Sequence, residues 1–504
     1  MHLSVRAGLL TALMATAVPV AHAADVTPEQ ARLLEGQLRT WIQGVVGPGT
    51  TLSARPVQAT PDGERFRLML PIGIPQTGTN ESIALLGSAR PLDGGRWSIE
   101  GPYMPSPSRF TLSIPTPPTE RQKAQGKSAG PDVPVDYAVT VGGQESQGVF
   151  DPSFRTPSNL ANSVRDLRVE ATSDLATQVT SVVRSAGSST LRPSGPDRVD
   201  YIIDGTIEGY SMRTKAADSQ AVEIGARRVR VTGEITAISR ERVATIVPAL
   251  VRITGGFTGG LPKSPDTGAA AAVTPAIDPA VLRVVLQSLQ DLASEFKLDE
   301  TIDGIAVNYG PVAGTADQLR IGMGAKSEGG LLQAHMDLGL DGLALPDMQL
   351  GAMAELLPKK IAMRPVLTGV PVAELMRLLV AAGESKSSGP PPEFAAMLRR
   401  GTVGVGLDSF ALDVAGASFA GMGKFVVTSP ETIGGQAQVT ATNFDALMAK
   451  ANAMPELGGA LPVLVFAKGI GRAVEGRLVW DITFRDRKLV VNGTDLTAMT
   501  GRQR

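Results

Sequence analysis

The chain has 504 residues, of which 43% are hydrophobic and 4% are aromatic, and its formal net charge is −1. This charge balance lacks the basic surface that nucleic-acid binding requires, which excludes nucleic acid as a partner. Cysteine is absent, so disulfides, thiolate metal ligands and a lipid-modified cysteine are also excluded.

The first residues have the pattern of a cleavable signal peptide. Arg6 precedes an apolar stretch over residues 7–20, and Ala21-His22-Ala23 then provides an A-x-A cleavage site. The stretch is shorter than the roughly 20 residues that a membrane-spanning helix needs. We therefore expect residues 1–23 to be a signal peptide cleaved after Ala23. The mature chain is then expected in the periplasm of a Gram-negative bacterium, without a transmembrane segment.

Residues 24–115 are predicted to form a helix followed by a β-meander. Apolar residues recur at helical spacing from Glu29 to Val46. In the stretch that follows, Phe66, Leu68 and Leu70 occupy alternate positions and share one face, which is the period of a half-buried strand. Residues 116–134 are rich in Pro, Lys, Gln and Ser, and they are predicted to be a linker.

Residues 135–254 carry long alternating stretches, including Arg198 to Met212 and Ala226 to Ile238. In the second of these, the alternation places Val229, Val231 and Ile235 on one face and charged residues on the other. Such strands are longer than the usual five or six residues, which predicts a large antiparallel sheet. Helical periodicity is predicted afterwards, from Glu241 to Ile253.

A Gly/Pro/Ala-rich spacer at residues 255–278 is the predicted boundary to a C-terminal α+β domain at 279–504. Alternating strands in this domain are interleaved with expected helices at Pro279–Phe296, Met353–Leu357, Val372–Ala382, Phe444–Ala453 and Leu461–Ile470. The pattern indicates an α+β fold rather than a βαβ fold. We expect a large, long-stranded, mainly antiparallel curved sheet in two similar halves, with helices packed on one face.

One histidine, His335, remains after cleavage. Within the run from His335 to Asp341, alternation places His335, Asp337 and Asp341 on one strand face, which is compatible with a metal site or half of a catalytic triad. Without a second histidine or any cysteine, the polar face of an amphipathic strand is the favoured interpretation.

Ser294-Glu295-Phe296-Lys297 matches the S-x-x-K pattern of penicillin-binding enzymes, in which the lysine one helical turn away activates the serine. The companion motifs Ser-x-Asn and Lys-Thr-Gly do not occur in the chain. The segment also falls at the end of a predicted helix, where a lysine is common because it interacts favourably with the helix dipole. We therefore interpret the match as a coincidence of sequence.

Two kinds of glycine pattern in the chain approach those of known sites. Ser418 lies in a near miss to the G-x-S-x-G nucleophile elbow, but the second glycine comes one position late and the segment alternates like a strand. Gly322-Met323-Gly324 and Gly404-Val405-Gly406 lack the rest of a phosphate-binding loop. We assign no catalytic, cofactor-binding or metal-binding residue and expect no cofactor.

The C-terminal segments Thr440–Leu447, Gly476–Phe484 and Leu489–Leu496 give a strand that enters a helix through Asn-Phe-Asp and a closing L-x-V-N-G strand. From about residue 435 onwards, the chain resembles a family of uncharacterised alphaproteobacterial exported envelope proteins and, more distantly, YdgA-like and AsmA-like proteins. The resemblance implies long antiparallel strands in a curved sheet whose apolar concave face could shelter acyl chains. It supplies no catalytic residue.

The methionine content is compatible with such an adaptable apolar surface. The chain has 16 methionines, among them Met336, Met348, Met363, Met376 and Met397. Period-2 alternation does not distinguish an open groove from a filled core.

We expect a non-enzymatic, exported cell-envelope protein that binds a lipid or another hydrophobic ligand, or an envelope protein. The alternative is an exported serine hydrolase that uses Ser294 with Lys297, or a site centred on His335.

Overall fold

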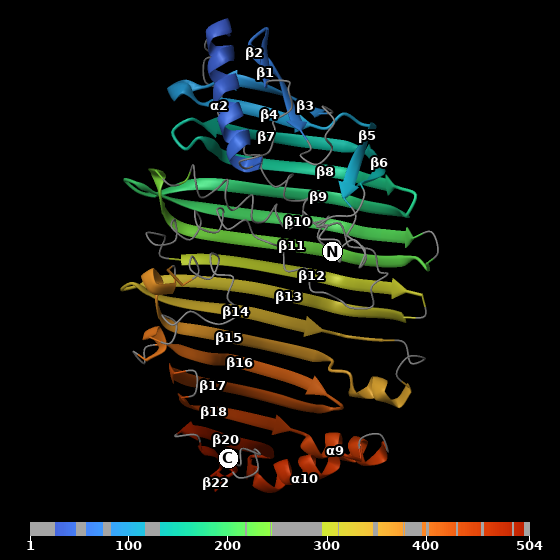
Figure 1. Cartoon of the computed structure of the whole chain (residues 1–504), viewed down its shortest axis with the longest axis vertical. Coiled ribbons are helices and arrows are strands. Elements are labelled where there is room, and N and C mark those ends of the chain that lie inside the picture. The colour runs from blue at the N-terminus through green and yellow to red at the C-terminus, as the bar shows by residue number, and fades with distance from the viewer. Residues whose placement is uncertain are drawn as a thin grey trace, which may run out of the picture. The chain divides into compact units, whose positions relative to one another are not determined.

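The alternating stretches of this sequence fold as long antiparallel strands, and helices are few, as the computed structural model shows (Figure 1). The predicted α+β class with a large, mainly antiparallel, curved sheet is therefore confirmed, and the sheet is unclosed. The chain divides into two compact units, Met1–Leu292 (unit 1) and Ala293–Arg504 (unit 2). The structure describes residues 26–46, 57–73, 82–115, 132–216, 219–241, 243, 295–310, 312–345, 351–375, 377–378, 396–399, 403–429, 432–454, 458–485 and 488–497.

Several sequence predictions lie outside the described residues. They include the signal peptide at 1–23, the spacer at 255–278, Met348 and Met376, and most of the linker at 116–134. Arg240, Glu241 and Val243 are helical, and the rest of the helix predicted to follow them is not described. These predictions remain predictions.

Unit 1 begins with a helix that covers the first strands of its sheet. The sheet runs in chain order from β1 to β4, continues from β7 to β11, and adds the β5–β6 hairpin through β6 at one end of β8. Its elements are α2 (Pro28–Val46), β1 (Gln58–Asp62), β2 (Arg65–Gly73), β3 (Ser82–Pro91), the 3₁₀ turn η1 (Asp93–Gly95), β4 (Trp97–Tyr103), β5 (Ser108–Pro115), β6 (Asp132–Thr140), β7 (Gly143–Asp151), β8 (Thr156–Thr172), β9 (Ala176–Gly195), β10 (Arg198–Ala216) and β11 (Val222–Ser239).

The start of α2 is fixed by a capping box. The Thr27 hydroxyl accepts a hydrogen bond from the Gln30 backbone N–H, and the Gln30 side chain accepts one from the Thr27 backbone N–H (3.2 and 3.1 Å). Pro28 follows the cap, where its missing N–H costs no helical hydrogen bond.

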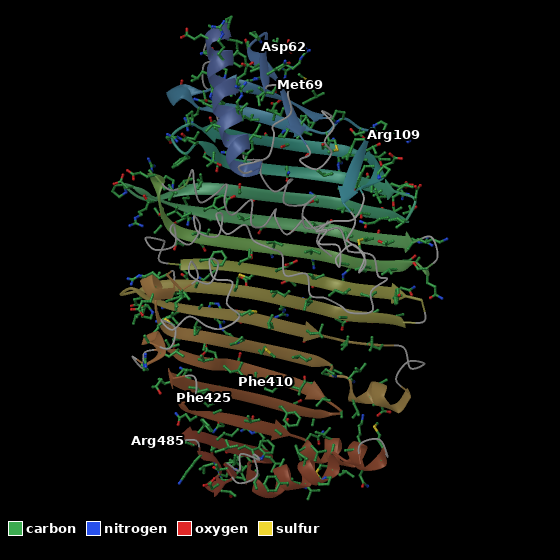
Figure 2. All side chains as sticks on the ribbon, in the orientation of Figure 1. Asp62, Met69, Arg109, Phe410, Phe425 and Arg485 are labelled. Carbon is green, nitrogen blue, oxygen red and sulfur yellow. The ribbon has the colours of Figure 1, made fainter. Side chains whose placement is uncertain are left out.

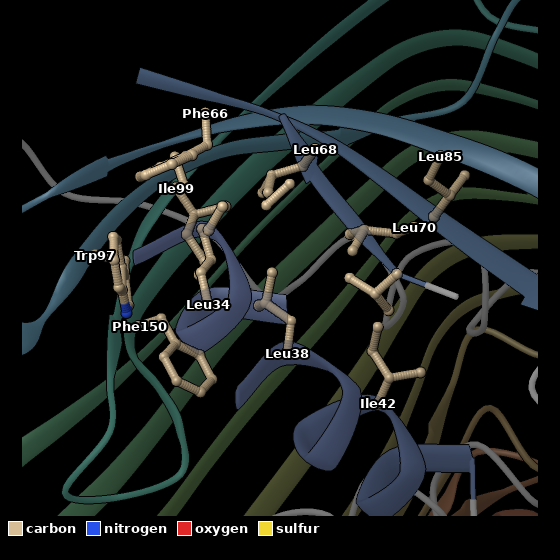
Figure 3. Packing of buried hydrophobic residues seen from close by; sticks show 14 of the residues in the cluster. Leu34, Leu38, Ile42, Phe66, Leu68, Leu70, Leu85, Trp97, Ile99 and Phe150 are labelled. Atoms are coloured by element: carbon tan, nitrogen blue, oxygen red, sulfur yellow. The ribbon is translucent and has the colours of Figure 1, made fainter. Parts of the chain in front are cut away.

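Helix α2 buries its apolar stripe against the sheet. Leu34 and Leu38 are fully buried and contribute to one core with Phe66, Leu68 and Trp97, as Figure 3 shows. The Trp97 indole N–H donates to the Gln37 side-chain oxygen at 2.7 Å, so the one polar atom of this ring is satisfied.

The long strands of unit 1 separate apolar from charged side chains as the alternation predicts. The register places Val229, Val231 and Ile235 of β11 on one face. Val229 and Ile235 are buried there. On the opposite, polar face, Arg230 pairs with Asp204 of β10 at 3.1 Å.

Unit 2 repeats this design with strands paired in chain order from β12 to β18, followed by β20. β19 and β21 pair with β20, and β22 pairs with β21. Its elements are β12 (Glu295–Tyr309), β13 (Val312–Glu328), β14 (Leu331–Asp341), the 3₁₀ helix η2 (Gly351–Leu356), β15 (Lys360–Pro371), β16 (Gly404–Val414), β17 (Ala417–Ser429), β18 (Thr432–Thr442), α9 (Phe444–Ala453), α10 (Leu461–Ile470), β19 (Arg472–Val474), β20 (Arg477–Arg485), β21 (Lys488–Val491) and β22 (Thr494–Asp495).

The expected helices of unit 2 are confirmed in part. Both α9 and α10 have the predicted bounds. The helix expected over Pro279–Phe296 is wrong at its end, because Glu295 and Phe296 open strand β12 and pair with β13. Cross-strand pairing overrides helical periodicity there. The helix expected at Met353–Leu357 is the single 3₁₀ segment η2.

The packing of α2 predicts a difference between two adjacent leucines. Leu34→Ala should lower the free energy of unfolding by about 2–5 kcal/mol, because it leaves a cavity in the core. Leu33→Ala should change it by less than about 0.5 kcal/mol, because Leu33 is 53% exposed. Urea unfolding followed by tryptophan fluorescence measures both, since Trp41 and Trp97 pack in this core. Equal losses would contradict the packing.

Candidate functional site

The serine–lysine pair of the hydrolase alternative lies only partly within the described residues. Ser294 lies outside the described residues, and Lys297 lies within β12. Its amine pairs with the Glu295 carboxylate at 3.0 Å. The interpretation of Lys297 as a helix C-terminal residue is therefore wrong, because the segment is a strand.

His335 and Asp337 lie together on the polar face of β14, as the alternation predicts, with 3.6 Å between Nε2 and Oδ2. Arg364 of β15 lies 3.5 Å from the other oxygen of Asp337. The His335 ring lies over the backbone of Gly324, where a Cβ would overlap it. Asp341 is the register partner of Lys360. The arrangement is a partly exposed charge cluster on a strand surface, of a kind that contributes little to stability.

Other polar candidates are similarly placed in strands. Ser418 is exposed in β17, opposite Thr442 of β18, and not at a strand-to-helix turn. Gly322 lies under the side chains of Asp299 and Asp337, so it allows close packing rather than forming a phosphate loop. Among the described residues, no group of three or more His, Asp or Glu side chains could hold a metal ion.

Unit 1 has a surface hollow of about 480 Å³ over β4, β7, β8 and β9. Glu100, Tyr103, Glu145 and Arg184 contribute to its lining. Burial, and then the nearby Glu100 carboxylate, raise the pKa of Tyr103, whose hydroxyl donates to the Ser146 carbonyl at 3.2 Å. A phenol that stays protonated between two acids is not an activated nucleophile.

The opposite face of the unit 2 sheet is apolar, and the sequence pattern indicated Met336 and Met363 on it but not Met323. We call it the apolar face. The register brings the following side chains together on it: Phe296, Leu298, Ile302, Leu319, Ile321, Met323, Leu332, Met336, Leu338, Leu340, Ile361, Met363, Leu367, Val405, Leu407, Phe410, Leu412, Phe419 and Phe425.

The centre of the apolar face is open. Met323 and Met336, which are direct partners across β13 and β14, are 42% and 43% exposed. Neighbours such as Ile321, Leu338 and Phe410 are only half-buried; Phe410 is labelled in Figure 2. The long strands of unit 1 differ, because many of their large apolar residues, including Val182, Ile207, Tyr210 and Met212, are buried.

Among the described residues, helical segments pack on the margins of the apolar face. Side chains of α9 and α10, including Phe444 and Leu464, pack on the β18–β20 end together with Trp480. A second cluster, which contains Met397 and Leu398, covers Val370 and Leu367 at the end of β15. The expectation of helices on one face is met, and the half-exposed strip from β13 to β16 lies between these clusters.

An acid interrupts the apolar face at β12. Glu300 of β12 lies between Leu298 and Ile302 on that face and opposite Ile321 of β13. Burial raises its pKa. None of the described residues pairs with its carboxylate. The nearest acid that continues the alternation of the face is Asp317 of β13, which is exposed and four residues from Ile321. The sequence signal was a charge at an apolar position of the run Phe296-Lys297-Leu298-Asp299-Glu300-Thr301-Ile302.

Comparisons with protein-family models, with curated proteins and with solved structures find no match. Within the described part of the chain, no helix has the length and apolar character needed to cross a membrane.

Glu300 makes stability depend on pH. Its folded pKa is raised, so its stabilising contribution is present below the unfolded pKa of about 4.3 and is lost as pH rises through the folded pKa. Glu300→Gln should therefore be more stable than the wild type near neutral pH, by about 1 kcal/mol. The difference should disappear at about pH 4.

Thermal unfolding at the two pH values measures this effect. Asp299→Asn is the matched control, because Asp299 is exposed on the opposite face of the same strand. A pH-independent difference for Glu300→Gln, or the same pattern for Asp299→Asn, would contradict the assignment.

Proposed function

We propose that this is a non-enzymatic, exported cell-envelope protein that binds the acyl chain of a lipid on the apolar face of unit 2. The observation that supports the proposal is the half-exposed strip around Met323 and Met336, which continues over neighbouring strands. Large exposed apolar patches on folded proteins commonly mark interaction sites. The resemblance of the C-terminal segments to exported envelope proteins is compatible with this role.

The dimensions of the strip suit an acyl chain. Strands in a sheet lie about 4.8 Å apart, so the seven strands from β12 to β18 extend over about 29 Å. The hydrocarbon core of a bilayer is about 30 Å thick, which gives about 15 Å for the acyl chain of one leaflet. An acyl chain laid across the strands would therefore contact side chains of several strands at once.

We assign no catalytic residue to this chain. Lys297 and His335, around which the serine-hydrolase alternative is built, lie on the polar face, away from the proposed ligand. Each contacts an acidic residue of its own strand. The alternative predicts ester hydrolysis that His335→Ala or Lys297→Ala abolishes.

Two methionines on opposite faces test the lipid site. Met336→Lys should weaken binding of the neutral fluorescent probe Nile red at least about tenfold, because it places a charge in the apolar strip. Met422→Lys should leave binding unchanged, because Met422 is 61% exposed on the polar face of β17. Fluorescence titration of the full chain gives both affinities.

Native mass spectrometry of protein purified from its host is the complementary measurement. Bound lipid that is lost in Met336→Lys and kept in Met422→Lys would support the proposal. Absence of lipid from the wild type, together with equal probe affinities of the two variants, would overturn it.

An envelope protein as partner is the second candidate, and α10 favours it. Leu464, Ala467 and Ile470 pack inward from this helix. Val463 and Val465 on its outer side are 66% and 55% exposed. A helix that is apolar on both sides normally has both covered.

Site-specific photo-crosslinking tests this second candidate. A crosslinker at Val463 should give one discrete protein adduct in cells, and Phe466→Ser should remove it by altering the exposed side of α10. A crosslinker at Val183, which is 59% exposed in unit 1, is the control. No adduct at Val463, or the same adduct at both positions, would contradict docking at α10.

A further inference from the structure

We propose that Glu300 makes the apolar face selective for amphiphiles that carry a protonated amine. This inference rests on the proposed lipid-binding function and names the ligand class. The alkyl chain would lie on the apolar strip, and the ammonium group would donate hydrogen bonds to the Glu300 carboxylate.

The position of Glu300 supports a role in recognising the polar end of the ligand. Its neighbours on the same face are Leu298 and Ile302, and Ile321 is opposite. The described cations nearest in register, such as Lys297 and Arg320, alternate onto the polar face. A ligand that lies over Leu298, Ile321 and Met323 therefore meets the Glu300 carboxylate and no described positive charge.

A structural acid in this protein is surrounded quite differently. Asp200 of β10 is 8% exposed, and burial would raise its pKa, but hydrogen bonds from the Ala237 N–H, Ser194 and Arg192 outweigh burial and lower it. The Ala237 N–H lies 2.9 Å from the Asp200 carboxylate, and Arg192 lies 3.3 Å from it. Glu300 has no such partners among the described residues, although a charge without a partner destabilises a fold.

The polar group of the ligand determines its expected affinity for a site beside Glu300. An ammonium group supplies a positive charge and N–H donors, and hydrogen bonds to charged groups are stronger than neutral ones. A hydroxyl group supplies a single neutral donor. A fatty-acid carboxylate would face Glu300 as a like charge, which is unfavourable at short distance. Affinity should therefore fall from amine to alcohol to carboxylate.

Two sources share the required chemistry, namely single-chain amines and the ethanolamine headgroup of phospholipids. Dodecylamine represents the first, and lysophosphatidylethanolamine represents the second. Dodecanol, dodecanoate and lysophosphatidylglycerol are the matched probes without an amine.

The experiment is displacement of Nile red from the full chain by each probe at neutral pH. The wild type should bind dodecylamine about tenfold or more tightly than dodecanoate. Glu300→Gln should remove this preference and retain dodecanol binding. Asp299→Asn, which removes an acid from the opposite face of β12, should keep the preference. Preference for lysophosphatidylethanolamine over lysophosphatidylglycerol assigns the phospholipid source, whereas preference for dodecylamine alone assigns the single-chain source.

Equal affinities of the wild type for amine and carboxylate would overturn the inference. So would a preference that survives in Glu300→Gln, or one that Asp299→Asn also removes. If the apolar face does not bind lipid at all, the result is different. Met336→Lys and the wild type would then have equal affinities for Nile red and for dodecanol. Circular dichroism at the titration pH verifies that each variant is folded.

Discussion

The structure depends on the antiparallel register, which fixes the face on which every side chain lies. Side chains alternate with a period of two, so a slip of one residue in any strand would move its apolar residues to the charged face. The continuity of the apolar face through Ile321, Leu338, Met363 and Phe410 therefore requires each successive pair of strands in unit 2 to keep its register. The charge cluster at His335 lies on the polar face for the same reason.

The strand register holds in both units, but their apolar side chains differ in how far they are buried. In unit 1, Ile207 and Met212 are buried, and they stabilise the fold by removing apolar area from water. In unit 2, Met323 and Met336 occupy comparable strand positions but leave much of their surface exposed. That surface contributes little to folding, and it is available to a ligand. Methionine suits such a surface because its flexible, polarizable side chain adapts to different contacts.

The sequence predicts the strands and their two faces well, because both are local properties. Alternation was sufficient to place Val229 with Ile235 and His335 with Asp337, and periodicity was sufficient to bound α9 and α10. It failed at Phe296, where pairing with β13 decides the conformation. Alternation also gives no measure of exposure, because a covered face and an open face have the same period. The isolation of Glu300 depends on Ile321 of another strand, so the run around Glu300 does not reveal it.

Two acids of β12, Asp303 and Glu300, lie on opposite faces of the strand and differ in their hydrogen-bond partners. Asp303 is 8% exposed, and its carboxylate accepts a hydrogen bond from the Gln318 amide at 2.7 Å, so its burial is compensated. Glu300, three residues earlier, faces apolar neighbours, and burial raises its pKa. An apolar residue at position 300 would continue the pattern of Leu298 and Ile302 and would avoid this cost. Glu300 therefore lowers the stability of the fold at a position where an apolar residue would raise it. Such a residue is typical of a binding site, since function commonly tolerates local destabilisation.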